Sequence, residues 1–157
     1  MLVLNWLLVL ALSATPLLEL RASIPYGFAV KLPPLAVLLL SVAGSWLPAF
    51  FVVFILEYVE PFLRKIKFLN DLLDRVYAKT RAKSEQIQKW EFWGLILFIG
   101  VPLPGTGVWT GSLAGYLLGL SRRKIILASL LGTTLAGLAM VLILTLGISG
   151  FNWLFKV

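Results

Sequence analysis

Two ionisable residues in an otherwise apolar stretch are the strongest candidates for chemistry. Glu19 and Arg21 lie two positions apart, and Glu19 is the one acid outside residues 57–91. In a regular helix such residues point about 200° apart, so only an irregular backbone would let both face one cavity. There the arginine could neutralise the carboxylate or bind an anionic group, and Glu19 could carry a proton. An ion pair at the water interface is the alternative.

A second polar set follows the segment Val101-Pro-Leu-Pro-Gly-Thr-Gly107. Its two prolines remove backbone donors and its two glycines have no helical preference, so a helix should break there. Thr106 in this segment, and Trp109, Thr110 and Tyr116 just beyond it, offer hydroxyl and indole groups for hydrogen bonds. Trp109 is equally well explained as an anchor at the membrane interface.

The composition predicts an all-α integral membrane protein. Of the 157 residues 60% are hydrophobic and 13% charged, against about 25% charged in soluble domains. Residues 32–56, 92–121 and 125–155 contain no charge, and each stretch exceeds the ~20 residues that cross a bilayer. Residues 1–18 are a fourth apolar run, without the positive start of a cleaved signal. We expect one membrane domain over residues 1–157.

Several function classes are excluded by missing residue types. The sequence has no histidine and no cysteine, which rules out disulfides, thiol chemistry, haem ligation, the usual zinc sites and histidine-based catalysis. It also lacks the glycine-rich phosphate loop of ATP-driven motors. We therefore expect no metal, no cofactor and no catalytic residues, and the protein is not predicted to be an enzyme.

The distribution of the +7 net charge indicates membrane topology and argues against nucleic-acid binding. Eight of the fourteen basic residues lie in residues 64–89 and three more in residues 122–124. Basic residues beside membrane spans mark the cytoplasmic side and attract anionic lipids. This predicts an inner (plasma) membrane protein with residues 57–91 and 122–124 in the cytoplasm. Residues 57–91 have the period of an amphipathic helix starting near Pro61, either on the membrane surface or in an oligomer contact.

The same charges choose between two paths for residues 92–121. A complete crossing would put the two basic clusters on opposite sides, whereas a re-entrant hairpin with its tip at residues 102–107 keeps both in the cytoplasm. We predict the hairpin, with breaks at Pro102, Pro104, Gly105 and Gly107. Backbone at membrane depth must be surrounded by protein or a wet cavity. Glycines spaced by four then predict close helix packing: Gly107, Gly111, Gly115 and Gly119.

An internal repeat extends this prediction to the first half. Residues 41–47 and 129–135 share the pattern Ser-x-x-Gly-[Ser/Thr]-x-Leu, and we match Pro25 and Gly27 with Pro104 and Gly107 as hairpin breaks. The first repeat is then residues 1–56, with a hairpin near 13–32 and a span at 34–56. The second is residues 92–157, with a hairpin at 92–121 and a span at 124–148. Opposed broken segments of this kind are a transporter architecture.

The sequence resembles the small multidrug export proteins, a branch similar to the DedA-type membrane proteins. The resemblance lies in Glu19-Leu-Arg-Ala-Ser-Ile-Pro-Tyr-Gly27 and Val101-Pro-Leu-Pro-Gly-Thr-Gly-Val-Trp-Thr-Gly111. It implies two facing re-entrant hairpins, often a homodimer, and DedA-type relatives are associated with moving phospholipids or polyprenyl-phosphate carriers and with the proton gradient. Those relatives carry arginines in the second hairpin, whereas residues 102–116 here have none, which leaves Arg21 as the cation at depth.

These observations together predict a small transporter that moves a lipid or another amphipathic substrate. Substrate or proton binding is assigned to Glu19, Arg21, Thr106, Trp109 and Thr110, and the expected partners are membrane lipids, a second copy of the chain and the proton gradient. Two alternatives stay open. One is an exporter of hydrophobic cations or drugs. The other is a membrane scaffold that uses residues 57–91 as its partner surface.

Overall fold

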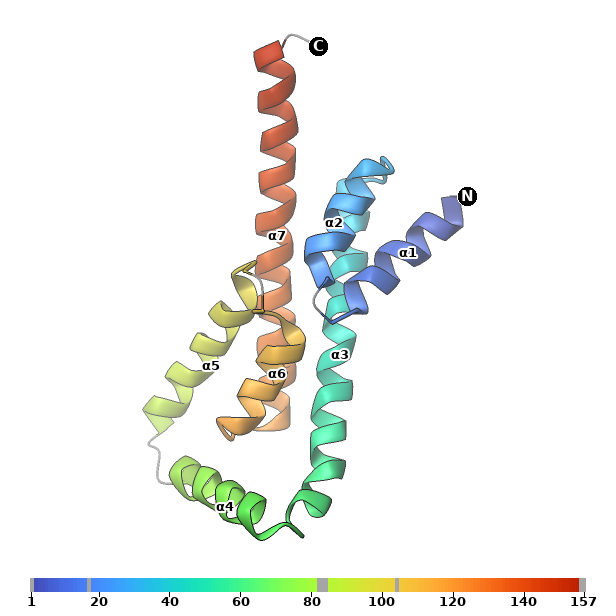
Figure 1. Cartoon of the computed structure of the whole chain (residues 1–157). Helices are drawn as coiled ribbons and strands as arrows, with labels where there is room; N and C mark the ends of the chain where they lie inside the picture. Colours follow the sequence, from blue (N-terminus) through green and yellow to red (C-terminus); the bar gives the residue numbers. More distant parts are fainter. Residues whose placement is uncertain (1, 17, 82–84, 104, 156–157) are drawn as a thin grey trace.

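Two long helices form the centre of the molecule, and four short ones flank them (Figure 1). The computed structural model describes residues 2–16, 18–81, 85–103 and 105–155, and this part of the chain has helices and no strand. The helices are α1 (Leu2–Ala14), α2 (Glu19–Ala29), α3 (Pro34–Leu63), α4 (Lys67–Arg81), α5 (Glu85–Gly100), α6 (Val108–Leu117) and α7 (Arg122–Phe155).

Among the helices of the described residues, only the two central ones have the length of a membrane span. α3 has 30 residues and α7 has 34, so at 1.5 Å per residue they reach about 45–50 Å, more than the ~30 Å hydrocarbon core. Both are long and apolar enough to cross a membrane. The flanking helices have 13, 11, 16 and 10 residues and reach about 15–24 Å. Each of these four is too short to cross alone.

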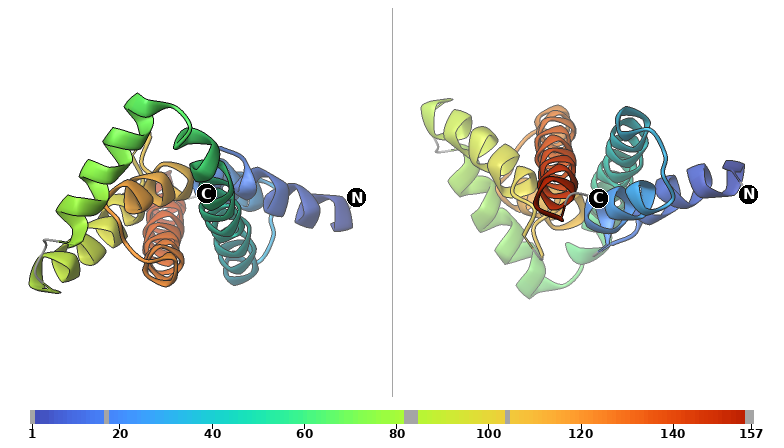
Figure 2. Two further views of the ribbon diagram at one scale, coloured as in Figure 1. Left: turned by 90° about the horizontal axis from the view of Figure 1, so that it is seen from below. Right: turned by 90° about the horizontal axis from the view of Figure 1, so that it is seen from above.

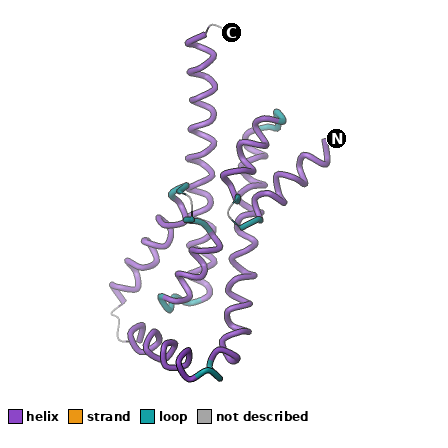
Figure 3. The backbone as a smooth tube through the Cα atoms, in the orientation of Figure 1, coloured by secondary structure: helices purple, strands orange, loops and turns teal. Residues whose placement is uncertain are grey.

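The short helices are paired in two hairpins on opposite sides of the central pair. Seen along the bundle, α1 and α2 flank α3 while α5 and α6 flank α7 (Figure 2). Both hairpin loops lie partway along α3 and α7, one between Ala14 and Glu19 and the other at residues 101–107 (Figure 3). The two loops therefore face each other inside the bundle.

A glycine in each long helix allows a short helix to pack closely on it, α1 on α3 and α5 on α7. A Cβ added at Gly44 of α3 would lie 2.7 Å from the carbonyl oxygen of Leu10 in α1. One added at Gly132 of α7 would lie 3.0 Å from the carbonyl oxygen of Ile96 in α5. Small residues permit such backbone approach in membranes. These are the glycines of the two repeated sequence patterns, so the same residue performs the same packing role in both halves.

Polar side chains are buried and large apolar ones face outwards, the reverse of a soluble protein. Ser23 of α2 donates a hydrogen bond to Ser41 of α3 over 2.8 Å, and the hydroxyls of Ser112 and Ser129 lie 3.4 Å apart between α6 and α7. By contrast, Leu35 is 69% exposed. This distribution suits a molecule whose surroundings are lipid.

The turns that follow α2 and α6 have the same hydrogen bonds. Leu32 N–H donates to the Gly27 carbonyl and Leu120 N–H to the Gly115 carbonyl, each over 3.0 Å. The residue before each leucine has a positive φ, 57° at Lys31 and 74° at Gly119. Gly27 thus corresponds to Gly115, and each lies 17 positions before the glycine that packs its long helix (44 − 27 and 132 − 115).

These facts correct the predicted breaks and the predicted glycine stripe. Pro25 and Gly27 lie inside α2 rather than at a hairpin tip, because proline's fixed φ is compatible with a helix and Gly27 packs against Val37. The first break instead lies between Ala14 and Glu19. Gly119 is in the turn after α6 and is not a helix-packing residue. Pro104 lies outside the described residues.

Residues 57–91, predicted to be cytoplasmic, also differ in structure from the prediction. Pro61 lies in the last turn of α3 instead of starting an amphipathic helix, and α4 begins at Lys67. Arg64 joins these two helices, with Nη1 2.9 Å from Asp74 Oδ1 of α4 and Nε 2.9 Å from Glu60 Oε1 of α3. Glu60 also accepts a hydrogen bond from Tyr116 of α6. Predicted residues 57–91 are therefore divided among three helices.

Candidate functional site

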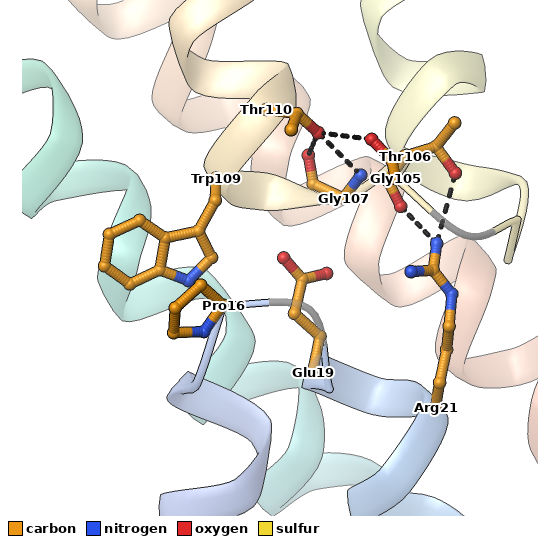
Figure 4. A pocket seen from close by; sticks show the side chains of 8 residues that line it. All are labelled: Pro16, Glu19, Arg21, Gly105, Thr106, Gly107, Trp109 and Thr110. Atoms are coloured by element: carbon orange, nitrogen blue, oxygen red, sulfur yellow. Dashed lines mark hydrogen bonds between the residues drawn. The ribbon is translucent and has the colours of Figure 1, made fainter.

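A polar pocket of about 90 Å³ lies between the two hairpin loops (Figure 4). At roughly 30 Å³ per water molecule it has room for on the order of three waters. It brings together all five residues to which the sequence assigns substrate or proton binding. The lining residues are Pro16, Glu19, Arg21, Gly105, Thr106, Gly107, Trp109 and Thr110.

Glu19 connects the first hairpin to the start of α6 in the second. Its carboxylate lies beside the backbone N–H groups of Val108 and Trp109 and interacts with them electrostatically; these are the first two residues of α6. The first N–H groups of a helix lack partners within the helix and favour a negative charge. Glu19 therefore caps a helix that begins 89 positions later in the chain (108 − 19), and its side chain is buried at 6% exposure.

The backbone of Glu19 is held in an unfavourable conformation. Its φ of 43° lies in the left-handed region, which costs a residue other than glycine about 1 kcal/mol or more. Because Glu19 departs from regular helix geometry, its side chain and that of Arg21 both point into the pocket (Figure 4). The irregular backbone required to bring the two charges together is thus present. Strain at a buried charged residue is typical of functional sites.

Gly107 makes room for the Glu19 carboxylate. A Cβ added at Gly107 would lie 2.6 Å from Cδ of Glu19, closer than such atoms approach. The φ of −175° at Gly107 is extended, a conformation that any residue adopts. Glycine is therefore favoured here by the approach of the Glu19 carboxylate, whereas the sequence predicts a helix break and helix packing at this position. Glycine suits position 105 for a different reason, because its φ of 84° lies in the left-handed region, which glycine adopts without steric cost.

Arg21 contacts the opposite loop through its guanidinium group. Nη2 donates to the carbonyl oxygen of Thr106 and lies 3.2 Å from its hydroxyl oxygen. The Nε atom is buried and has no hydrogen-bond partner, and a buried donor left unsatisfied costs about 1–3 kcal/mol. Glu19 and Arg21 thus face one pocket while being held by different partners, and Arg21 retains an unused donor.

The two threonines stabilise the loop with their hydroxyl groups. Thr106 Oγ1 donates towards the carbonyls of Val101 and Leu103, each 2.8 Å away. Thr110 Oγ1 accepts from the Gly107 N–H over 3.2 Å and lies 2.9 Å from the Gly105 carbonyl. These bonds satisfy polar backbone groups that lipid could not. The threonines therefore shape the pocket as well as line it.

Trp109 separates the polar pocket from an apolar groove. Its indole Nε1 donates to the carbonyl of Ala14 over 3.3 Å, and its ring meets Phe51 edge to face with centroids 6.3 Å apart. Trp109 and Thr110 line both the polar pocket and the groove beside it. The tryptophan is thus placed between the hairpin loops.

The remaining sequence candidates lie away from the pocket. A Cβ at Gly111 would be 2.6 Å from Ile99 Cδ1, and one at Gly115 would be 2.8 Å from Leu95 Cδ2. Both glycines therefore pack α6 on α5. Pro102 lines a small cavity of about 10 Å³ behind Arg21. Tyr116, at the far end of α6, contacts Glu60.

The long apolar helices and the outward apolar surface suit a helical membrane protein, and a charged pocket lies between its two hairpin loops. The chain belongs to the small multi-drug export protein family, whose model matches residues 19–139. The family's description points to an export-type transporter. No curated protein and no solved structure matches the chain significantly. The matched region begins at Glu19 and includes every residue of the polar pocket except Pro16.

Proposed function

We propose that this protein is a small inner-membrane transporter for an amphipathic molecule with an anionic headgroup, such as a lipid phosphate. The observation that carries the proposal is the Arg21 side chain, whose guanidinium group lines the pocket between the two hairpin loops. Arginine binds phosphate and carboxylate groups strongly through its several N–H donors. An anion entering the pocket would meet this positive charge.

The charge environment favours an anionic over a cationic cargo. A hydrophobic cation would need a carboxylate free to pair with it, but the Glu19 carboxylate is engaged by two N–H groups of α6. Moving Glu19 to a cation would expose the start of that helix. Arg21 lines the pocket while its Nη2 is bonded to Thr106, so its charge is available to an anion there. The hydrophobic-cation exporter therefore ranks second.

The topology we propose is an inverted repeat of a re-entrant hairpin and a membrane span, with the hairpin breaks between Ala14 and Glu19 and at residues 101–107. It is supported by hairpin helices too short to cross, by the equal 17-residue spacing in the two halves (44 − 27 and 132 − 115), and by loops that meet within the bundle (Figure 3). Facing broken segments near the midplane are where transporters of this architecture bind cargo. A homodimer and a DedA-like lipid translocase remain part of this proposal.

The test is transport by purified protein in proteoliposomes, with lysophosphatidic acid as the anionic amphiphile and tetraphenylphosphonium as the hydrophobic cation. Arg21→Gln should lose most of the phosphate flux, because amide groups cannot neutralise the headgroup, and should leave cation flux unchanged. Arg75→Gln, which removes an exposed charge from α4, is the matched control. Phosphate flux that persists at the wild-type rate in Arg21→Gln would reject an anion-binding role for the pocket.

A further inference from the structure

An apolar groove runs from the polar pocket along α3 and α6. It has a volume of about 360 Å³, and its residues belong to the parts of α3 and α6 that follow the hairpin loops along the chain. Five apolar side chains form its walls together with Trp109 and Thr110, and none of the charged pocket residues lines it. They are Phe51, Val52, Ile55 and Leu56 of α3 and Leu113 of α6.

The groove adjoins the charged site and differs from it in chemistry. Trp109 and Thr110 line both spaces, and the tryptophan ring presents one side to Glu19 and Pro16 and another to Phe51 (Figure 4). A molecule that spans both spaces must therefore be charged at one end and apolar at the other. At roughly 30 Å³ per group the groove holds on the order of ten methylene groups.

We infer that this groove binds the hydrocarbon chain of the amphiphile whose headgroup occupies the polar pocket. The inference rests on the proposed function and adds the tail subsite and its direction. Phe51 is 56% exposed and Leu113 is 42% exposed, so the groove opens to the surrounding lipid and a chain can enter sideways. With the head at the loops, the chain runs towards α4.

The headgroup, and not the groove, supplies the selectivity. Lipid tails are as apolar as the groove, so a chain gains little free energy by leaving the bilayer for it. A headgroup held by Arg21 instead raises the local concentration of its own tail at the groove. Chain binding should therefore depend on Arg21, and a zwitterionic lipid of the same chain length should show no preference for the groove.

The direction of the chain has a consequence for orientation. If α4 is cytoplasmic, a lipid bound with its head at the loops and its tail towards α4 has the polarity of an outer-leaflet lipid. The bound state thus corresponds to a headgroup drawn inwards from the outer leaflet. An inner-leaflet lipid would have to turn over to occupy the same two subsites.

The experiment uses the full chain in phosphatidylcholine vesicles and a lysophosphatidic acid analogue with a diazirine midway along its acyl chain. After irradiation, cross-linked residues are mapped by mass spectrometry. We expect adducts at residues 51–56 and 109–113, displaced by unlabelled lysophosphatidic acid and absent in Arg21→Gln. Leu113→Trp, which fills the groove, should lose them, while Leu138→Trp on the exposed surface of α7 should keep them.

Three outcomes would overturn the inference. Adducts spread over the exposed residues of α7, such as Leu127 and Leu142, would mean that the groove holds bulk lipid without selection. A groove free of adducts and protected from labelling would mean that a second copy of the chain covers it. Adducts that survive in Arg21→Gln would show that binding of the tail does not depend on the contact between Arg21 and the headgroup. Transport flux is measured in parallel, so that failure of this inference can be told from failure of the proposed function. Adducts confined to the groove in a protein that shows no flux would reject transport while supporting the tail subsite.

Discussion

At the scale of single residues, the charge of Glu19 and the missing side chain of Gly107 belong to one contact. The carboxylate can reach the start of α6 only because Gly107 leaves the space. Neither residue has this role in isolation. Substitutions at the two positions should therefore have related consequences for stability and for transport.

Gly107→Ala should destabilise the protein by about 1–3 kcal/mol, the usual range for an overpacked buried site. The added Cβ would lie 2.6 Å from Glu19 Cδ and would force the carboxylate away from α6. Gly94→Ala in α5 is the control, because a Cβ there meets nothing within 4 Å and alanine is the better helix former. Thermal unfolding in detergent measures both. Equal melting temperatures for the two variants would argue against the contact.

Glu19→Gln tests whether the carboxylate carries a proton during transport. Glutamine keeps an oxygen that can accept from the α6 N–H groups but cannot be ionised, so the fold should survive with a loss of about 1 kcal/mol from the helix terminus. If Glu19 couples flux to protons, the variant's flux should no longer change with external pH. Proteoliposome flux measured from about pH 5.5 to about pH 8 tests this. An unchanged pH profile would exclude Glu19 as the coupling group.

The residues of the pocket could be chosen from the sequence, but their contacts could not. An acid, a base, two threonines and a tryptophan stand out because such residues are costly or interfacial in a membrane. That Glu19 caps α6 depends on where a helix 89 positions later begins (108 − 19). Local sequence contains no information on such a pairing, and the strained φ of Glu19 is equally a product of the tertiary contact.

At the scale of helices, the composition was sufficient to predict the two long helices. α3 begins at the predicted residue 34, and α7 begins at 122 rather than 124. The second hairpin loop follows from its prolines and glycines. The first loop could not be located, because a proline in a loop and a proline within a helix look alike in sequence. The packing of Gly27 on Val37 decides between them.

Gly44→Ala should separate α1 from α3 and lower stability by about 1–3 kcal/mol. Its Cβ would meet the Leu10 carbonyl at 2.7 Å, and a backbone atom within a helix cannot move aside alone. Gly137→Ala in α7 provides the comparison, since its contact at 2.7 Å is the end of the Leu38 side chain, which can rotate. Unfolding in detergent should rank Gly44→Ala as the more damaging. The reverse order would show that the α1–α3 contact is looser than the structure has it.

At the scale of the whole molecule, the topology can be tested with single cysteines, since the natural chain has none. Ser121→Cys and Asp71→Cys, both exposed, should react with a membrane-impermeant maleimide from the same side. Lys31→Cys, exposed in the turn after α2, should react from the other. If Ser121 instead reacted together with Lys31, residues 92–121 would cross the membrane completely and the hairpin would be rejected.

The opposite charges of Glu19 and Arg21 in one pocket also determine how the molecule responds to voltage. Together they sum to zero, so a membrane potential exerts almost no net force on the pair when the pocket moves empty. A bound anion changes this, because each elementary charge carried across the membrane is worth about 2.3 kcal/mol per 100 mV. The electrical work of a transport cycle would then be set by the cargo, and the direction of its current would report the sign of the molecule being moved.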